Sequence, residues 1–219
     1  MSFKDDGFEI LDGLISLNEI EVIKSELSGL ECLGGGLRNA EKRLPSVAKL
    51  VESKFFVDLA SEYLPAKARI VRSILFIKSI ENNWFVAWHQ DKTVAVSVKM
   101  DKPGWGPWST KDGVLHVQPP IAVLEQMITF RIHLDDSTED NGCLKVVPNS
   151  HRGGIMPQDK IQDYTKIHRA VSCVAPAGSV LVMRPHILHS SSKAISHQPR
   201  RVLHVEYSSY QLPHGVKWA

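Results

Sequence analysis

Apolar residues recur at helical spacing only in the first third of the chain. The stretch SLNEIEVIKSELSGL (residues 16–30) begins with Ser16 and Glu19 in a capping-box pattern, and apolar residues follow at intervals of three and four. A second stretch, LPSVAKLVESKFFVDLASEYL (residues 44–64), has a proline near its start and similar spacing. We therefore expect residues 1–66 to be largely helical.

The pattern changes to short alternating segments in the rest of the chain. These segments are rich in Val, Ile, Leu, Phe and Thr, and Gly, Pro, Asn and Asp separate them. In RRVLHVEY (residues 200–207), for example, the apolar Leu203 and Val205 alternate with the polar His204 and Glu206. Many short strands after a helical layer predict a β-sandwich or barrel with helices on one outer face. Without repeats or linkers, a single domain of residues 1–219 with a β core over 67–219 is expected.

Composition narrows the range of partners. The chain has 219 residues, 43% of them hydrophobic and 23% charged, with a formal net charge of +2. No basic block points to nucleic acid, no run of 18 apolar residues points to a membrane span, and the N-terminus does not resemble a secretory signal. Cys32, Cys143 and Cys173 are few and far apart, as is typical of reduced thiols in a cytoplasmic protein. A small-molecule partner is expected, and no oligomeric state is indicated.

One histidine and one acid two residues apart occur at three places. In a strand, such residues point the same way and can supply two ligands to one metal ion. With 10 histidines and 24 acids, about one such pair is expected by chance. Spacing alone therefore does not separate the three candidates, which are His89/Asp91, His133/Asp135 and His204/Glu206.

Context near the C-terminus favours a metal site. The segment VLVMRPHILHSSS (residues 180–192) leads an apolar strand into His186 and His189, and Arg200 follows His189 after eleven residues. A histidine there could bind iron, while an arginine on the neighbouring strand could bind the far carboxylate of a dicarboxylic cosubstrate with its planar fork. The spacing leaves His186 as an alternative metal ligand and Arg201 as an alternative carboxylate partner.

Three motifs in order resemble one known family. WHQD (residues 88–91), LDDSTEDNGCLKVVPNSHRGG (134–154) and the histidine–arginine segment just described are similar to the phytanoyl-CoA dioxygenase family of Fe(II)/2-oxoglutarate oxygenases. DGFEILDGLISLNEIEVIKSEL (residues 6–27) also resembles that family's opening helix. The resemblance covers nearly the whole chain. It implies a mainly β protein with N-terminal helices, built as a double-stranded β-helix, the jelly-roll or cupin-like barrel.

The resemblance also implies roles for individual residues. His89, Asp91 and His189 become ligands of Fe(II), and Arg200 becomes the partner of the 2-oxoglutarate 5-carboxylate, with O2 as the oxidant. The other two histidine–acid pairs become structural, and Arg201 becomes a surface cation. The implied reaction hydroxylates an unactivated C–H bond and releases succinate and CO2. Halogenases of the superfamily have a small residue in place of this metal-binding carboxylate. Because Asp91 is present here, hydroxylation is favoured over halogenation.

Two further cations lie in strands near the expected barrel mouth. Lys78 and Arg131 could contact 2-oxoglutarate or an anionic substrate, and relatives often carry tryptophan where Arg131 stands. Alternatively, Arg131 extends to solvent or pairs with Asp135 or Glu139. A small anionic substrate is favoured.

Two loops are also expected near the site. Residues 139–151 contain two turn signals and predict a hairpin at the rim, from which His151 could reach the substrate. Residues 101–113 predict a mobile gating loop. Trp84, Trp88, Trp105 and Trp108 are expected in core or lid packing rather than in substrate stacking.

Two rival functions share the expected fold. One is a non-catalytic jelly roll that binds a small ligand, and the other is a cupin-like metal protein that does not use 2-oxoglutarate. In the second, Arg200 would have no role. The chain is short for the family, so the resemblance does not imply acyl-CoA as the substrate.

Overall fold

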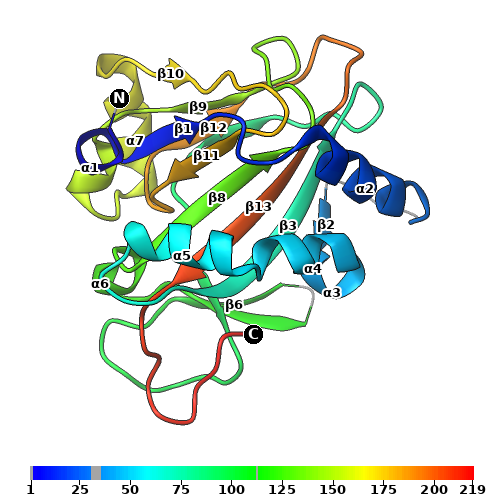
Figure 1. The fold of residues 1–219 in the computed structure, drawn as a ribbon. Coiled ribbons are helices and arrows are strands. Elements are labelled where there is room, and N and C mark those ends of the chain that lie inside the picture. The colour runs from blue at the N-terminus through cyan, green and yellow to red at the C-terminus, as the bar shows by residue number, and fades with distance from the viewer. Residues whose placement is uncertain (1, 31–35, 112) are drawn as a thin grey trace.

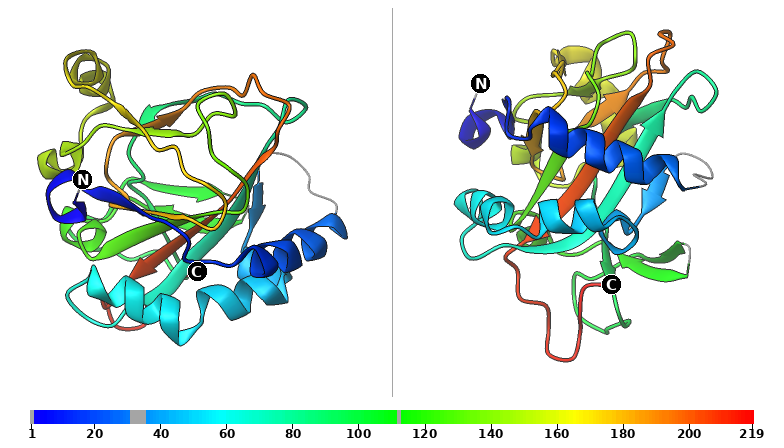
Figure 2. Two further views of the ribbon diagram at one scale, coloured as in Figure 1. Left: turned by 45° about the horizontal axis from the view of Figure 1, so that its top comes forward. Right: turned by 45° about the vertical axis from the view of Figure 1, so that its right-hand side comes forward.

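Two antiparallel sheets face each other and enclose the interior of a barrel (Figures 1 and 2). The computed structural model describes residues 2–30, 36–111 and 113–219. One sheet has six strands in the order β1-β11-β8-β13-β3-β2, and the other has four in the order β10-β9-β12-β4. A separate three-stranded sheet, β5-β7-β6, lies beside the C-terminal segment at the bottom of Figure 1.

The elements have the following bounds. The strands of the two large sheets are β1 Phe8–Leu11, β2 Gly36–Arg38, β3 Arg69–Lys78, β4 Val86–His89, β8 Met127–His133, β9 Leu144–Val146, β10 Val171–Ser172, β11 Val180–Met183, β12 His189–Ser191 and β13 Arg200–Ser208. Those of the small sheet are β5 Val94–Val96, β6 Trp108–Lys111 and β7 Val114–Val117. The helices are α1 Phe3–Asp6, α2 Leu17–Ser28, α3 Ala40–Arg43, α4 Pro45–Val51, α5 Lys54–Glu62, α6 Ile121–Leu124, α7 Gln158–Ile167 and the 3-10 helix Ser150–Gly153.

Strand β13 shows how the alternating pattern sets the two faces of the six-stranded sheet. Leu203, Val205 and Tyr207 are fully buried in the main apolar cluster, which includes residues of helices α2, α4 and α5. The hydroxyl of Tyr207 donates to the backbone oxygen of Val51 in α4 at 2.8 Å. Alternate side chains of a strand point to opposite faces. The intervening polar residues of β13 therefore face the barrel interior, while the helices cover the outer face (Figure 1).

Both predicted helical stretches are helical, and the second is divided. Helix α2 begins with the predicted capping box, in which Ser16 and Glu19 satisfy each other's backbone N–H groups. The second stretch forms α4 and α5 because Ser53 interrupts the helix and caps the next one, accepting a bond from the Phe56 amide.

Replacing Ser16 with alanine should lower the free energy of unfolding by about 1 kcal/mol, because the first amides of α2 lose their acceptor. Urea denaturation at neutral pH measures the difference. Ser25→Ala is the matched control, since Ser25 is exposed in the interior of the same helix. An equal loss in both variants would contradict the capping role of Ser16.

The segment predicted as a gating loop instead contains strand β6. Its residues pair with β7, and Trp105 and Trp108 pack on an apolar cluster around Val94 and Val117. These two tryptophans, and Trp88 against another cluster, are in the predicted packing positions. Residues 101–107 are in no helix or strand, as predicted, whereas 108–111 form the first strand of a hairpin with β7, which follows after only two residues.

The predicted hairpin over residues 139–151 is also absent. Gly142 has a positive φ of 76°, as the turn requires, but strand β9 pairs with β10 and β12 rather than with a preceding strand. The turn was therefore correctly predicted and the pairing was not.

Two sequence predictions concern the environment of the protein. No helix in the described part of the chain combines the length and apolar character that a bilayer crossing requires. Cys143 and Cys173 are buried free thiols, and Cys32 lies outside the described residues. The cytoplasmic location stays a prediction.

Candidate metal centre and cosubstrate pocket

Strand register brings together two histidines that are a hundred residues apart in the chain. In the antiparallel pair of β4 and β12, His89 and His189 are direct partners. Asp91 follows β4 by two residues, and its backbone N–H donates to the oxygen of Pro185 at 2.9 Å. This bond ties the segment carrying Asp91 to the chain just before β12.

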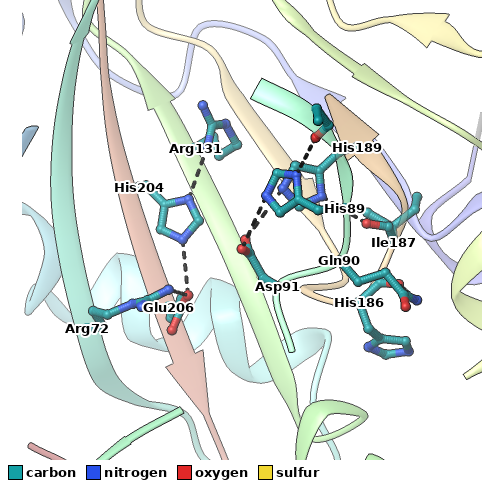
Figure 3. Close-up of polar contacts among 11 residues, drawn as sticks. Arg72, His89, Gln90, Asp91, Arg131, His186, Ile187, His189, His204 and Glu206 are labelled. Carbon is teal, nitrogen blue, oxygen red and sulfur yellow. Dashed lines mark hydrogen bonds and ion pairs between the residues drawn. The ribbon is translucent and has the colours of Figure 1, made fainter. Parts of the chain in front are cut away.

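The three side chains form a compact group suited to one metal ion (Figure 3). In both histidines, Nδ1 bonds the carbonyl oxygen of the residue two before it, at 2.8 Å for His89 and 2.9 Å for His189. Each Nε2 therefore remains available, and it lies 3.7 Å (His89) or 3.6 Å (His189) from a carboxylate oxygen of Asp91. Two oriented imidazoles and one carboxylate are the donor set of a facial-triad iron site.

Protonation also favours metal binding. Burial lowers the pKa of His189 to about 4, against an opposing effect of Asp91, so this imidazole is neutral at pH 7. Burial disfavours the charged form of Asp91, but the surrounding imidazoles and Arg72 outweigh burial and hold its pKa below the usual range. A metal ion needs deprotonated ligands, and both side chains supply them at neutral pH.

A cavity of about 230 Å³ opens in front of the three side chains. Phe76, Trp84, Val86 and Leu144 form its apolar wall. Its polar lining includes Ser191 and the arginines of three neighbouring strands, Arg72, Arg131 and Arg200. Trp84 thus lines the pocket, contrary to the packing role expected from the sequence.

One end of this cavity is strongly cationic. Arg200 is 3% exposed, and its Nε and Nη1 have no partner among the described residues. Lys78 is fully buried behind Ser191, where its Nζ donates to Ser191 Oγ at 2.7 Å and to the Ser192 carbonyl at 2.8 Å. Burial and repulsion from Arg131 lower the pKa of Arg200 to about 9, and burial with both arginines lowers that of Lys78 to about 8. Unpaired buried cations are costly, so this end fits a dicarboxylate.

Arg131 is buried, not extended to solvent. It is 6% exposed and does not pair with Asp135 or Glu139 as the sequence allowed. Its Nη1 instead donates to Nδ1 of His204 at 3.1 Å. Its Nε has no partner among the described residues.

His204 and Glu206, expected to be structural, lie beside the metal candidates. Because Arg131 only donates, Nδ1 of His204 accepts, and Nε2 donates to Glu206 at 3.1 Å. Arg72 also binds Glu206, which completes a buried chain of four side chains (Figure 3). His204 and Glu206 each have a ligand atom within 4.8 Å of an Asp91 oxygen. Arg72 and Arg131 already supply positive charge to this group, which disfavours a second metal ion there.

The pair His133/Asp135 has the structural role expected of it. Asp135 accepts two side-chain bonds from Arg201, each of 2.7 Å, and one from the Arg201 backbone at 2.9 Å. Arg201, predicted to be a surface cation, is partly exposed and is held in this salt bridge. His133 is buried, and burial lowers its pKa to about 3.

Asp135→Asn should lower the free energy of unfolding by about 1 to 2 kcal/mol at pH 7, because a bidentate ion pair is lost. The hydrogen bonds of Arg201 lower the pKa of Asp135 in the folded state, so this stabilisation is present above the ordinary pKa of about 3.9. It should disappear as the pH falls below that value and the folded carboxyl takes up a proton. Urea denaturation from pH 7 to pH 3 measures the trend. Asp163→Asn, in an exposed ion pair, is the control and should change little.

The alternative histidines face a different cavity. His186 and His151 both line a solvent-open cavity that does not include His89, and their rings are 6.0 Å apart. Figure 3 shows His186 pointing away from Asp91. The prediction that His151 reaches the substrate therefore finds no support in the geometry, and the imidazole of His186 is not part of the group of metal candidates.

Comparison with known proteins agrees with this arrangement. The sequence pattern of the phytanoyl-CoA dioxygenase (PhyH) family matches residues 3–202. The chain belongs to this family. The phytanoyl-CoA dioxygenase family consists of Fe(II)/2-oxoglutarate-dependent oxygenases, and its members are built on the double-stranded β-helix that the sequence predicted.

One relative of this chain, L-proline trans-4-hydroxylase from Streptomyces griseoviridis, is 26% identical to it over 187 residues. The match covers 74% of this chain but only 62% of the hydroxylase, less than two thirds of its length. HygX from Streptomyces hygroscopicus, solved with nickel and 2-oxoglutarate bound, superposes with a TM-score of 0.69 at 14% identity, over 94% of this chain and 84% of HygX. The carbocyclase SnoK from nogalamycin biosynthesis gives a TM-score of 0.70 at 19% identity, over 94% and 81% of the two chains. At these identities the two structures show a shared fold.

Proposed function

We propose that this protein is an Fe(II)/2-oxoglutarate-dependent dioxygenase that hydroxylates an unactivated C–H bond of a small molecule and releases succinate and CO2. The observation that carries the proposal is the meeting of His89, Asp91 and His189 with Arg200 in one cavity. Family membership supports the cofactor pair, and the similarity to a proline hydroxylase supports the reaction type.

In this proposal His89, Asp91 and His189 hold the iron, and the backbone carbonyls bonded to the two Nδ1 atoms fix the rings. Arg200 binds the distal carboxylate of 2-oxoglutarate, and Arg131 and Lys78 add positive charge at the same end of the cavity. When bound, iron(II) and 2-oxoglutarate supply the oxidising chemistry with O2. The chain contributes ligand orientation, an apolar wall that excludes water, and positioning of the substrate.

Two features support the finer assignment. Asp91 occupies the carboxylate position that halogenases of the superfamily leave open, which supports hydroxylation. The cavity of about 230 Å³ is smaller than the roughly 300–1,000 Å³ of sites that enclose a drug-sized ligand, and it must also hold the cosubstrate. This size supports a small substrate over an acyl-CoA thioester.

Uncoupled turnover tests the proposal without knowledge of the substrate. The purified protein is incubated with Fe(II), 2-oxoglutarate and O2, and succinate is measured by mass spectrometry. We expect succinate only when all three are present, and none when Zn(II) replaces Fe(II). No succinate under any condition would overturn the proposal in favour of a ligand-binding jelly roll. Once a substrate is found, a product that gains one oxygen atom distinguishes hydroxylation from cyclisation.

A further inference from the structure

Arg72 lines two cavities. It is on β3 and lines both the cavity of the metal candidates and a smaller one of about 40 Å³. A volume of that size holds a few water molecules or a group such as a carboxylate. An anion bound in the smaller cavity would therefore be in reach of Arg72, whose side chain also lines the cavity of Asp91.

Three cations, Arg38, Arg72 and Lys111, contribute to the wall of the smaller cavity. Ala219 and His116 also line it, and burial lowers the pKa of His116, so that its imidazole is neutral at pH 7. His116 is 3% exposed, and its Nδ1 has no partner among the described residues. The Nε of Arg72 is likewise buried without a partner in the described part of the chain. Two buried nitrogens without partners thus lie in or beside one cationic cavity, where a bound ligand would satisfy them.

Formal charge in the metal cavity leads to the same conclusion. Iron(II) and doubly ionised 2-oxoglutarate cancel each other. Three arginines then remain, Arg72, Arg131 and Arg200. Among the acids whose contacts the structure describes at this site, only Asp91 and Glu206 oppose their charge. The cavity with metal and cosubstrate bound therefore keeps an excess positive charge. Burying that charge costs free energy, and a further anion would reduce the cost.

We propose that the substrate carries an anionic group, a carboxylate or one of similar size, and that Arg72 binds it beside His116 and Lys111. This inference rests on the proposed function and adds the class of substrate. Arg72 is held by Glu206, which is held in turn by His204 and hence by Arg131. The buried chain thereby fixes the substrate's charged end relative to the cosubstrate's end of the cavity. Ligand atoms of Asp91, His204 and Glu206 lie within 4.8 Å of one another, so the metal candidates face the middle of this chain, where the reacting carbon must be.

Binding of matched acids and amides tests this class. The protein is loaded with Mn(II) and saturating 2-oxoglutarate, so that no turnover occurs and Arg200 is already occupied. Propanoate with propanamide and benzoate with benzamide are titrated by calorimetry. We expect at least one acid to bind about 10-fold or more tightly than its amide, a difference of about 1.4 kcal/mol. Arg72→Gln should abolish this preference, and His116→Asn should reduce it.

Arg69→Gln is the matched control, because Arg69 is an exposed arginine at the start of the same strand. It should keep the wild-type preference for acids. If Arg72→Gln does not fold, Arg72→Lys replaces it and should weaken the preference, since a lysine cannot bind a carboxylate bidentately. The inference is overturned if no acid binds, if amides bind as well as acids, or if the Arg72 variants keep the full preference. Succinate formation by a wild-type protein without acid preference would reject this inference alone, whereas absence of succinate would reject the proposed function.

Discussion

Asp91→Ala should reduce 2-oxoglutarate-dependent succinate formation by at least about 100-fold. Loss of even an outer partner of a metal ligand commonly costs 10- to 100-fold in affinity or activity, and Asp91 is placed as a direct ligand. The variant keeps both imidazoles, but it removes the anionic donor that lies within 3.7 Å of each Nε2. It also leaves Arg72 with Glu206 as its ion-pair partner. Succinate release under Fe(II), 2-oxoglutarate and O2 measures the loss, and iron bound per protein shows whether it lies in metal binding.

The chain provides its own control for this experiment. Asp135 stands in the same His-x-Asp pattern, but it binds Arg201 away from the cavity. Asp135→Ala should therefore lower stability and leave succinate formation at the wild-type level at temperatures where it stays folded. Equal succinate formation by wild type and Asp91→Ala would reject the metal site.

The comparison of these two aspartates shows what periodicity alone could predict. Strand alternation correctly separated the faces of β13, because burial follows a period of two along the chain. The capping box at Ser16 was equally local and equally well predicted. The choice among the three histidine–acid pairs was different. It required the resemblance to a family, since each pair has the same spacing in the sequence.

The residues that meet across strands could not be predicted from spacing along the chain. His204 is the register partner of Arg131, and Glu206 is the partner of Arg72. Register depends on pairing between distant segments, and a single sequence does not record it. One signal was available: His204 and Glu206 share the parity of Arg200 on β13, so they had to face the same side of the sheet as that arginine. The same reasoning places Arg72 on the side of Lys78 in β3.

Arg200 and Arg201 are adjacent in the chain, but their substitution should have opposite effects on cosubstrate binding and on stability. Arg200→Gln should raise the KM for 2-oxoglutarate by at least about 30-fold, because truncation of one partner of a buried, hydrogen-bonded ion pair costs roughly 2 to 5 kcal/mol. With saturating 2-oxoglutarate, kcat should fall much less, since the lost contact binds the cosubstrate before and during the reaction alike. Succinate formation as a function of 2-oxoglutarate concentration gives both constants.

The effects of the two substitutions on the free energy of unfolding should be the reverse of their effects on KM. Arg200 is buried with two unpartnered nitrogens among the described residues, and burial together with Arg131 lowers its pKa to about 9, so its charge opposes folding of the empty protein. Arg200→Gln should therefore not lower the free energy of unfolding, whereas Arg201→Gln should lower it by breaking the bond to Asp135 and should leave KM unchanged. Urea denaturation without cosubstrate completes the comparison. A raised KM in the Arg201 variant, with none in the Arg200 variant, would transfer the carboxylate-binding role to Arg201. If neither variant changed KM, 2-oxoglutarate would bind without either arginine.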